Sequence, residues 1–372
     1  MVFLDENASL RTDSNFRTRE NEEHHICISP FENLAVDMIN NFPLDYMHLI
    51  CLGVMKKMLN LWVKGHQMSR LRAAQIQELS RDIIELREYI PIEFARRPRG
   101  INELDRWKAT EYRIFLLYLG PIILDKYLNA DYFQHFCVLH TAIRILCHPE
   151  DCFRNNLYAN QLLLYFVKMF KILYGNDNLV YNIHNLIHLS EDVKRYGSLD
   201  TLDAFPFENY LKKLKQMLRK SEKPLSQLNN RINENARFAT NSQNIISNAP
   251  LLLKPNIKHL PLGCVNSHKQ IKFKNCMLTT KSANNCCYLK DGSVFCIEYI
   301  GFKDEYPVIL GKKCIDLRPI PGYPLPKLWV DLKNKTFYWP PKEINTTGAI
   351  IKNIGPSDNW NMEVYRRIIG PY

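Results

Sequence analysis

One stretch of the sequence indicates the fold of the longer part of the chain: Ile76-Gln-Glu-Leu79-Ser-Arg-Asp-Ile83-Ile-Glu-Leu86-Arg-Glu-Tyr-Ile90-Pro91. Its apolar residues recur at spacings of 3, 4, 3 and 4, which places them on one face of an α-helix. Pro91 predicts the end of this helix, because proline lacks a backbone N–H and restricts the residue before it. The stretch therefore predicts an amphipathic helix that packs by one face.

Similar patterns extend over the rest of residues 41–235 and predict a helical domain. The further helices are expected at Leu116–Leu128, Phe133–Leu146, Leu157–Tyr174 and Tyr181–Tyr196. Gly120-Pro121 is expected to break or kink the first of them. Residues 1–40 are polar and acidic without a clear period, and we expect them to form an extended leader.

The pattern changes towards the C-terminus, after a stretch rich in Asn, Ser and Pro that reads as a linker at residues 236–262. Beyond it, Ile271 and Phe273 alternate with lysines, as in a half-buried strand. Asp291-Gly292 between two apolar runs is a strong hairpin signal, and a second hairpin is expected at 328–339. The predicted fold class is thus α+β, a mainly α-helical body followed by a small β-rich module at 263–372.

The composition is that of a globular protein, with 372 residues, 46% of them hydrophobic and 23% charged. It excludes a disordered tail, a collagen-like rod and a small disulfide-stapled domain. The longest clean apolar run, Ile114 to Leu124, is too short to cross a bilayer, so no membrane span is expected. The N-terminus lacks the features of a secretory signal, and eleven cysteines without framework spacing favour thiols in an intracellular, reducing compartment.

The net charge of +11 is unevenly distributed along the chain. Residues 1–50 carry 3 basic and 9 acidic side chains, whereas residues 201–300 carry 15 basic and 6 acidic ones. This asymmetry favours a polyanionic partner such as nucleic acid, or an acidic segment that folds back on a basic surface. Many basic proteins have neither a polyanionic partner nor an acidic segment that folds back on them.

The most pronounced basic feature lies between Phe207 and Lys220, where Pro206 suits the first turn of a helix. The apolar positions recur at helical spacing and are Phe207, Leu211, Leu214 and Leu218. The cations of the opposite face are Lys212, Lys213, Lys215, Arg219 and Lys220. A helix packed by the apolar stripe would present these cations to a phosphate backbone. The alternative is an ordinary solvated face, and basic clusters of this kind make nuclear localisation a hypothesis only.

No motif indicates a cofactor, a metal or a small-molecule substrate. His184 and His188 share a helix face, but Asn185 stands where a zinc hydrolase of the HExxH type needs glutamate. We expect packed histidines there. The clusters around Cys27 and Cys152 lack a second half at zinc-finger spacing, and the cysteines between Cys264 and Cys314 are expected to be small buried hydrophobes. P-loop, GxSxG and GxGxxG motifs are absent from the sequence.

Three stretches of the helical body form a recognisable set. They are Phe42-Pro-Leu-Asp45-Tyr-Met-His48, then Leu104-Asp-Arg-Trp-Lys-Ala-Thr-Glu111-Tyr-Arg-Ile-Phe, and Val180-Tyr-Asn-Ile-His184-Asn-Leu-Ile-His188-Leu-Ser-Glu-Asp-Val-Lys-Arg-Tyr-Gly197 followed by Ala204-Phe-Pro-Phe-Glu208. This set, within residues 11–235, resembles DDE transposases of the CACTA (En/Spm) type and their relatives in animal genomes. The first stretch is similar to the family's Leu-Asp-x-Met-His motif, and the third to its Pro-Phe-Glu region.

The sequence departs from the family's pattern upstream of Asp45, and this departure bears on whether the protein can cleave DNA. Such transposases cleave DNA with two metal ions held by acidic residues on an RNase H-like sheet. The family places that sheet upstream of the Leu-Asp-x-Met-His motif, and about forty residues precede Asp45 here. The resemblance implies only Asp45 and Glu111 as weak catalytic candidates, and Asp45 is better explained as a helix N-cap.

A shorter C-terminal stretch, Phe337-Tyr-Trp-Pro-Pro-Lys342 with Asn359-Trp360 and residues 365–372, is similar to a β-rich segment of uncharacterised arthropod proteins. That resemblance implies a fold and no biochemical role.

Three hypotheses follow for the function. The first is a transposase-derived, catalytically inactive protein that binds DNA non-specifically through the basic helix face. The second is a protein-interaction module without nucleic-acid binding. The third, and the weakest, is an active metal-dependent DDE transposase or nuclease.

Overall fold

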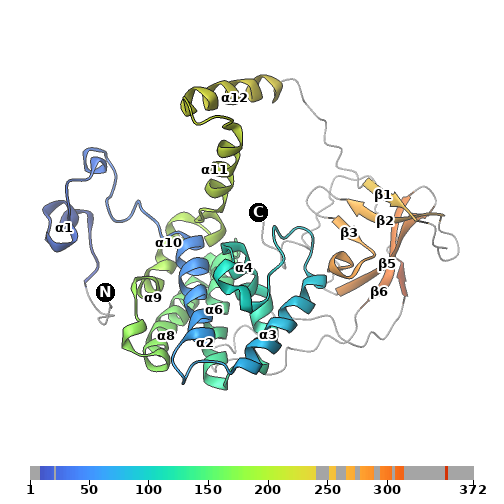
Figure 1. The fold of residues 1–372 in the computed structure, drawn as a ribbon, viewed down its shortest axis with the longest axis horizontal. Helices are drawn as coiled ribbons and strands as arrows, with labels where there is room; N and C mark the ends of the chain where they lie inside the picture. Colours follow the sequence, from blue (N-terminus) through green and yellow to red (C-terminus); the bar gives the residue numbers. More distant parts are fainter. Residues whose placement is uncertain are drawn as a thin grey trace. The chain divides into compact units, whose positions relative to one another are not determined.

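The fold is α+β, a mainly helical body followed by an antiparallel sheet (Figure 1), as the sequence predicts. The computed structural model describes residues 9–20, 22–239, 251–256, 265–272, 277–288, 294–303, 306–313 and 348–350. The chain forms two compact units. The first comprises Met1–Gln77 and Asn102–Ala204, and the second Glu78–Ile101 and Phe205–Tyr372.

The helices of the first unit surround an apolar core, except α1, which has no buried residue. They are α1 (Asp13–Thr18), α2 (Lys56–Lys64), α4 (Ala109–Ile114), α5 (Gly120–Ile123), α6 (Ala130–Cys147), α7 (Asp151–Arg154), α8 (Asn156–Tyr174), α9 (Tyr181–His184) and α10 (Leu189–Tyr196). Two π-helical segments, Met47–Met55 and Phe115–Leu119, lead into α2 and α5. Helices α6 and α8 pack along each other, and aromatic rings such as Phe136, Phe166 and Phe170 are fully buried. Burial of rings of this size supplies much of the apolar free energy of the fold.

Helix α3 (Ala73–Leu86) confirms the prediction from the opening stretch. Leu79, Ile83 and Ile90 are buried, and the other two apolar positions are half-buried. The helix ends at Leu86, and a 3-10 turn over Arg87–Tyr89 follows before Pro91. The helix therefore ends slightly earlier than proline alone requires.

The other predicted helices are confirmed with differences in detail. The two long ones coincide with α6 and α8, whereas the stretch 181–196 is divided by a 3-10 turn at Asn185–His188. Gly120-Pro121 does not break the chain's helical path, because Pro121 occupies the first turn of α5, where its missing N–H is not needed. Gly120 is required here by close packing, since a Cβ would lie 2.4 Å from the Phe136 ring.

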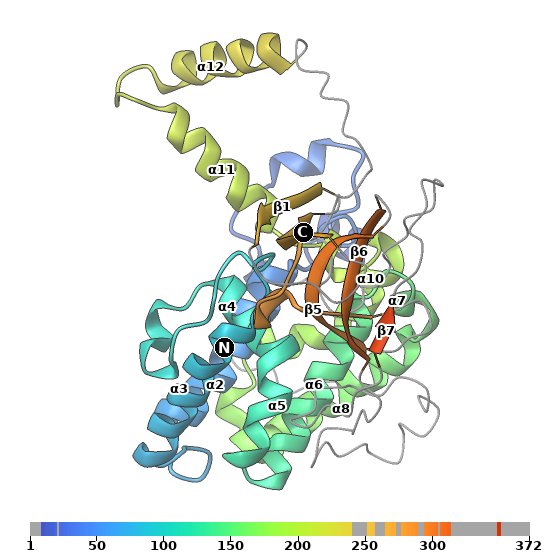
Figure 2. The ribbon, with the colours of Figure 1, turned by 90° about the vertical axis from the view of Figure 1, so that its right-hand side faces the viewer.

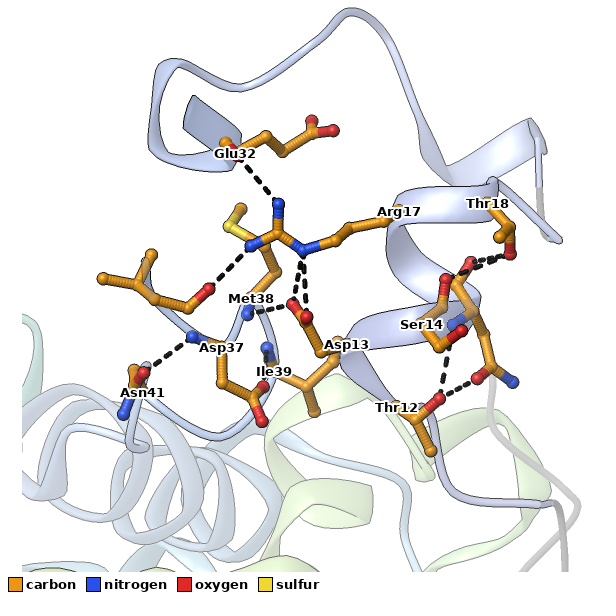
Figure 3. A network of polar contacts seen from close by, with 12 residues as sticks. Thr12, Asp13, Ser14, Arg17, Thr18, Glu32, Asp37, Met38, Ile39 and Asn41 are labelled. Atoms are coloured by element: carbon orange, nitrogen blue, oxygen red, sulfur yellow. Dashed lines mark hydrogen bonds and ion pairs between the residues drawn. The ribbon is translucent and has the colours of Figure 1, made fainter. Parts of the chain in front are cut away.

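The leader is more ordered than the extended segment expected from its sequence. Figure 3 shows the Arg17 guanidinium of α1 at the centre of a polar network. Its Nε donates to the Asp13 carboxylate at 2.9 Å, and its two terminal nitrogens donate to the carbonyl oxygens of Glu32 and Val36 at 2.8 and 2.7 Å. Asp13 also accepts from the Met38 N–H at 2.8 Å. The Arg17 side chain thus connects α1 to the backbone at Glu32 and at Val36, in a part of the chain that carries few apolar residues.

The C-terminal module is an antiparallel sheet in the order β1-β2-β5-β6-β7, with β3 paired to β2 and β4 paired to β5. The strands are β1 (Leu251–Pro255), β2 (Val265–Lys272), β3 (Met277–Thr279), β4 (Cys286–Tyr288), β5 (Val294–Lys303), β6 (Tyr306–Lys313) and β7 (Gly348–Ile350). Figure 2 shows β5 and β6 running side by side. The pairing of β4 with β5 confirms the first hairpin, while its Asp291-Gly292 turn lies outside the described residues.

The strand predictions differ from the sheet at one place, and another prediction lies outside the described residues. Strand β1 falls within the stretch expected to be a linker, because period-two alternation is hard to detect in Leu-Leu-Leu-Lys-Pro. The second predicted hairpin, at 328–339, lies outside the described residues, as does the C-terminal stretch similar to arthropod proteins. The sheet's apolar cluster includes Ile271, Phe295 and Ile300, and Cys287 joins it as the small buried hydrophobe that we expected.

The segment after α3 packs against this sheet, which the sequence does not indicate. Glu93 accepts hydrogen bonds from the Met277 N–H at 3.0 Å and from the Asn284 amide at 2.8 Å. The Ile92 N–H donates to the Asn284 side-chain oxygen at 3.1 Å. Residues 78–101 therefore belong to the second unit, although they lie in the middle of the predicted helical domain.

A buried histidine makes the stability of the helical body depend on pH. His135 is 2% exposed, its ring stacks on Phe166, and its Nε2–H donates to the Phe166 carbonyl oxygen at 2.9 Å. Burial lowers its pKa to about 4. The unfolded chain therefore binds more protons than the folded one between the ordinary pKa and about 4, and stability falls as the pH drops through this window.

We expect the free energy of unfolding to fall by roughly 2–3 kcal/mol from this residue between pH 7 and pH 4. His135→Gln keeps a donor for the Phe166 carbonyl but removes the titration, so its urea midpoint should vary less with pH than that of the wild type. Identical pH dependence of the two proteins would contradict a neutral, buried imidazole.

Candidate nucleic-acid interface

The basic stretch forms α11 (Phe205–Met217), followed by α12 (Pro224–Ala239), and Figure 1 shows the two consecutive helices. The sequence favours a helix here because Pro206 lies in the first turn and the rest of the stretch has high helix propensity. Glu208 in the first turn and Lys215 in the last complement the helix dipole. None of the residues of α11 is buried.

The predicted cations divide between the helix and the turn that follows it. Lys212, Lys213 and Lys215 lie on α11, whereas the helix ends at Met217, three residues before its predicted end. Arg219 and Lys220 therefore lie in the turn and not on the helix face. All five side chains are exposed, so the structure keeps them close along the chain and open to solvent.

A glutamine holds the turn that carries the last two cations, and the sequence analysis missed it. The Gln227 side-chain oxygen accepts from the N–H groups of Arg219 and Lys220 at 3.0 and 3.3 Å. Its amide donates to the carbonyl oxygens of Lys220 and Glu222 at 3.0 and 2.5 Å. These bonds satisfy backbone groups at a helix end, where orphan groups are otherwise left to water. Only the fold reveals this role, since a glutamine seven residues downstream carries no pattern.

The five cations keep their charge available for a partner. Within the described part of the chain, none of them forms an ion pair with a carboxylate, in contrast to neighbouring Arg231, which pairs with Glu234 at 2.8 Å. Glu208 and Glu222 are the acidic residues of the stretch 205–223. The same stretch carries six basic residues, the five cations and Lys223, which leaves a net positive charge along α11 and its turn.

The apolar stripe of α11 is not packed as we expected. Phe207 is 71% exposed, Leu211 50% and Tyr210 53%, while Leu214 and Leu218 are half-buried. The prediction assumed that apolar spacing implies burial, which holds only when another element covers the stripe. The helix therefore presents an apolar and a basic surface together.

Asp45 is the first of the two catalytic candidates. Its carboxylate accepts hydrogen bonds from backbone N–H groups. Its Oδ2 accepts from the His48 N–H at 2.9 Å and contacts the His48 ring. Its Oδ1 accepts from the N–H groups of Met47 at 3.3 Å and Ala204 at 2.7 Å. This arrangement is that of a helix N-cap with an additional long-range contact, in agreement with the alternative that the sequence analysis preferred.

Glu111 has a similar place at the start of α4. Its side chain is buried, with 1% of the residue exposed, and accepts from the Lys108 N–H at 2.9 Å. Among the described residues, no group of three or more His, Cys, Asp and Glu side chains is arranged to hold a metal ion. His184 and His188 contact each other edge to face, and burial together with His184 lowers the pKa of His188.

The structure brings together the three stretches that carry the transposase resemblance. Leu44 donates its N–H to Asp192 at 2.9 Å, and Tyr46 donates its N–H to the Leu202 carbonyl oxygen at 2.9 Å. Arg113, from the second stretch, forms an ion pair at 2.9 Å with Asp200, which lies between the two parts of the third stretch. The side chains of this pair are 5% and 9% exposed, so it is buried.

Three titratable side chains beside this ion pair are uncharged at neutral pH. Burial raises the pKa of Tyr46 well above its ordinary value and that of Cys51 to about 12. Burial also raises the pKa of the neighbouring Cys147 thiol well above its usual range. Burial thus keeps these three side chains neutral beside the ion pair, where removal of one charge of the pair is costly.

Comparison with known proteins identifies one family over part of the chain. A domain of unknown function (DUF8592) matches residues 248–346, which include β1 to β6. Neither a curated protein nor a solved structure matches the chain. In the described residues, none of the helices is both long and apolar enough to cross a membrane.

Removal of one partner of the buried pair should destabilise the first unit strongly. Asp200→Asn removes the buried carboxylate that pairs with the Arg113 guanidinium, and we expect a loss of about 3–5 kcal/mol in the free energy of unfolding. The matched control is Asp105→Asn, whose pair with Lys64 at 2.7 Å is largely exposed and should matter little. Denaturation in urea measures both, and equal losses would contradict the assignment.

Proposed function

We propose that this chain is a non-enzymatic protein that binds nucleic acid through the phosphate backbone. The observation that supports the proposal is the set of five exposed cations on α11 and its turn, which have no ion-pair partner among the described residues. Lysines without a counter-charge attract phosphates at long range and give up bound anions at little cost. The contacts would position the protein without reading bases.

The resemblance to transposases supports the same proposal independently of the exposed cations. A protein derived from a DNA-processing enzyme can keep a basic surface after its catalytic residues are lost. Asp45 and Glu111 cap helices here, and we propose no catalytic role for either of them. DNA binding in the nucleus would suit such a protein, and the nuclear location belongs to the proposal.

The salt dependence of binding tests the proposal. For a duplex of arbitrary sequence, five phosphate contacts predict that log K falls with log salt concentration with a slope of about −4 to −5. A variant with all five cations changed to glutamine should lose this slope and most of its affinity. Fluorescence anisotropy with a labelled duplex, at several salt concentrations, measures both quantities.

The control variant must lose the same charge elsewhere. A suitable set of exposed cations is Arg70, Arg72, Arg81, Arg96 and Lys168, each changed to glutamine. This variant should bind like the wild type apart from a small general loss. Equal loss of binding in both variants, or wild-type binding that does not respond to salt, would refute the proposed interface. Magnesium-dependent cleavage that disappears in Asp45→Ala would refute the non-enzymatic part.

The exposed apolar stripe of α11 supports a second candidate, a protein-interaction module. Phe207, Tyr210 and Leu211 of α11 are at least half exposed. Exposed apolar residues on one helix face commonly dock into a groove of a partner. This candidate differs from the first in the side chains that it uses.

A pair of variants separates the two candidates. Phe207→Ser with Leu211→Ser should abolish a stoichiometric protein complex that survives nuclease treatment, and should leave DNA binding unchanged. The five-cation variant should have the opposite effects. A complex that is insensitive to the apolar double variant would exclude this face as the protein-binding surface.

A further inference from the structure

Two cysteines of the sheet face each other across neighbouring strands. Cys286 of β4 lies opposite Cys296 of β5 in the antiparallel register, and their sulfur atoms are 3.2 Å apart. This separation is little more than 1 Å longer than the roughly 2.05 Å of a disulfide bond. A small rotation of either side chain would bring the two atoms to bonding distance.

The backbone at this position also suits a disulfide. The Ile297 N–H donates to the Asn285 carbonyl oxygen at 2.6 Å, so Asn285 and Ile297 form a hydrogen-bonded pair. Pair types alternate along an antiparallel ladder, which makes Cys286 and Cys296 the non-hydrogen-bonded pair. Cα atoms of such pairs are about 4.5 Å apart, at the short end of the range of about 4.4–6.8 Å that disulfides span.

The pair lies on the sheet face away from the apolar cluster. Cys287 and Phe295, one position further on each strand, belong to that cluster, so the alternation of a strand places Cys286 and Cys296 on the other face. A bond between them would leave the packed face unchanged. Cys286 is half-buried and Cys296 is 8% exposed, so a small oxidant can reach Cys286 first.

Cys51 and Cys137 of the helical body are more deeply buried than this pair, at 0% and 1% exposed. Burial raises the pKa of Cys51 to about 12, and it also raises the pKa of Cys137. The thiolate is the reacting form, so these side chains resist oxidation at neutral pH.

We propose that Cys286 and Cys296 are a modification site at which a peroxide forms a reversible cross-strand disulfide that fastens β4 to β5. The Cys286 thiolate attacks one peroxide oxygen, the O–O bond breaks, and water leaves with formation of a sulfenic acid. The Cys296 thiolate then attacks that sulfur and a second water leaves. Two thiols lose two protons and two electrons, and hydrogen peroxide is reduced to two waters. This inference does not depend on the proposed function.

Trypsin separates the two cysteines, which makes the bond easy to detect. Cleavage after Lys281, Lys290 and Lys303 gives the peptides 282–290 and 291–303, each with one partner of the pair. The full-length protein would be treated with a small excess of hydrogen peroxide, alkylated and digested without reductant. We expect a linked peptide about 2 Da lighter than the sum of the two peptides with Cys286 and Cys296 as thiols and Cys287 alkylated. A thiol reductant should restore the separate peptides.

Cys287 provides the matched control, because it lies in the same peptide but on the opposite face. Cys286→Ser should abolish the linked peptide, and Cys287→Ser should keep it. Fragmentation of the linked wild-type peptide assigns the bonded sulfur directly, so the test does not rely on the variants folding well. Linkage through Cys287, oxidation of Cys286 to sulfinic acid without linkage, or linkage only in urea would each overturn the proposal.

Discussion

The ion pair between Arg113 and Asp200 is the constraint on which the helical body depends. It joins the end of α4 to the segment between α10 and α11, more than eighty positions apart in the sequence, and it is nearly excluded from solvent. Burial of two charges is costly unless the geometry is good and both charges are kept. The surrounding backbone bonds from Leu44 to Asp192 and from Tyr46 to Leu202 hold the same segments in register. A chain that must preserve this pair cannot readily rearrange its core.

A second polar contact close to this ion pair in the sequence marks where the packed body ends. Asp45 caps the helix that begins at Tyr46 and also binds the N–H of Ala204, the last residue of the first unit. Directly after Ala204, α11 has no buried residue. Many of its side chains are charged, and others form an exposed apolar surface. Residues that contribute little to packing are free to serve recognition, which is the usual division between a rigid scaffold and a binding segment.

Sequence reasoning succeeded where one local pattern determines the structure. The spacing of Ile76, Leu79 and Ile83 predicted α3, and the Asp-Gly turn predicted the pairing of β4 with β5. It failed where a single polar side chain contacts distant backbone, as Arg17, Glu93 and Gln227 do, because such bonds leave no periodic trace. The cysteine pair belongs to the same class, since 286 and 296 meet only in the correct register. The proposed interface was half predictable: the exposure of its cations was expected, but that of its apolar stripe was not.

Hydrogen exchange of the full-length protein, with and without a DNA duplex at low salt, tests the central claim most directly. A helix without buried residues should exchange its amides quickly in the free protein. If α11 and its turn bind phosphates, DNA should slow exchange at residues 205–223 and leave the α6 and α8 amides unchanged. Unaltered exchange over 205–223, together with protection elsewhere, would show that nucleic acid binds a different surface.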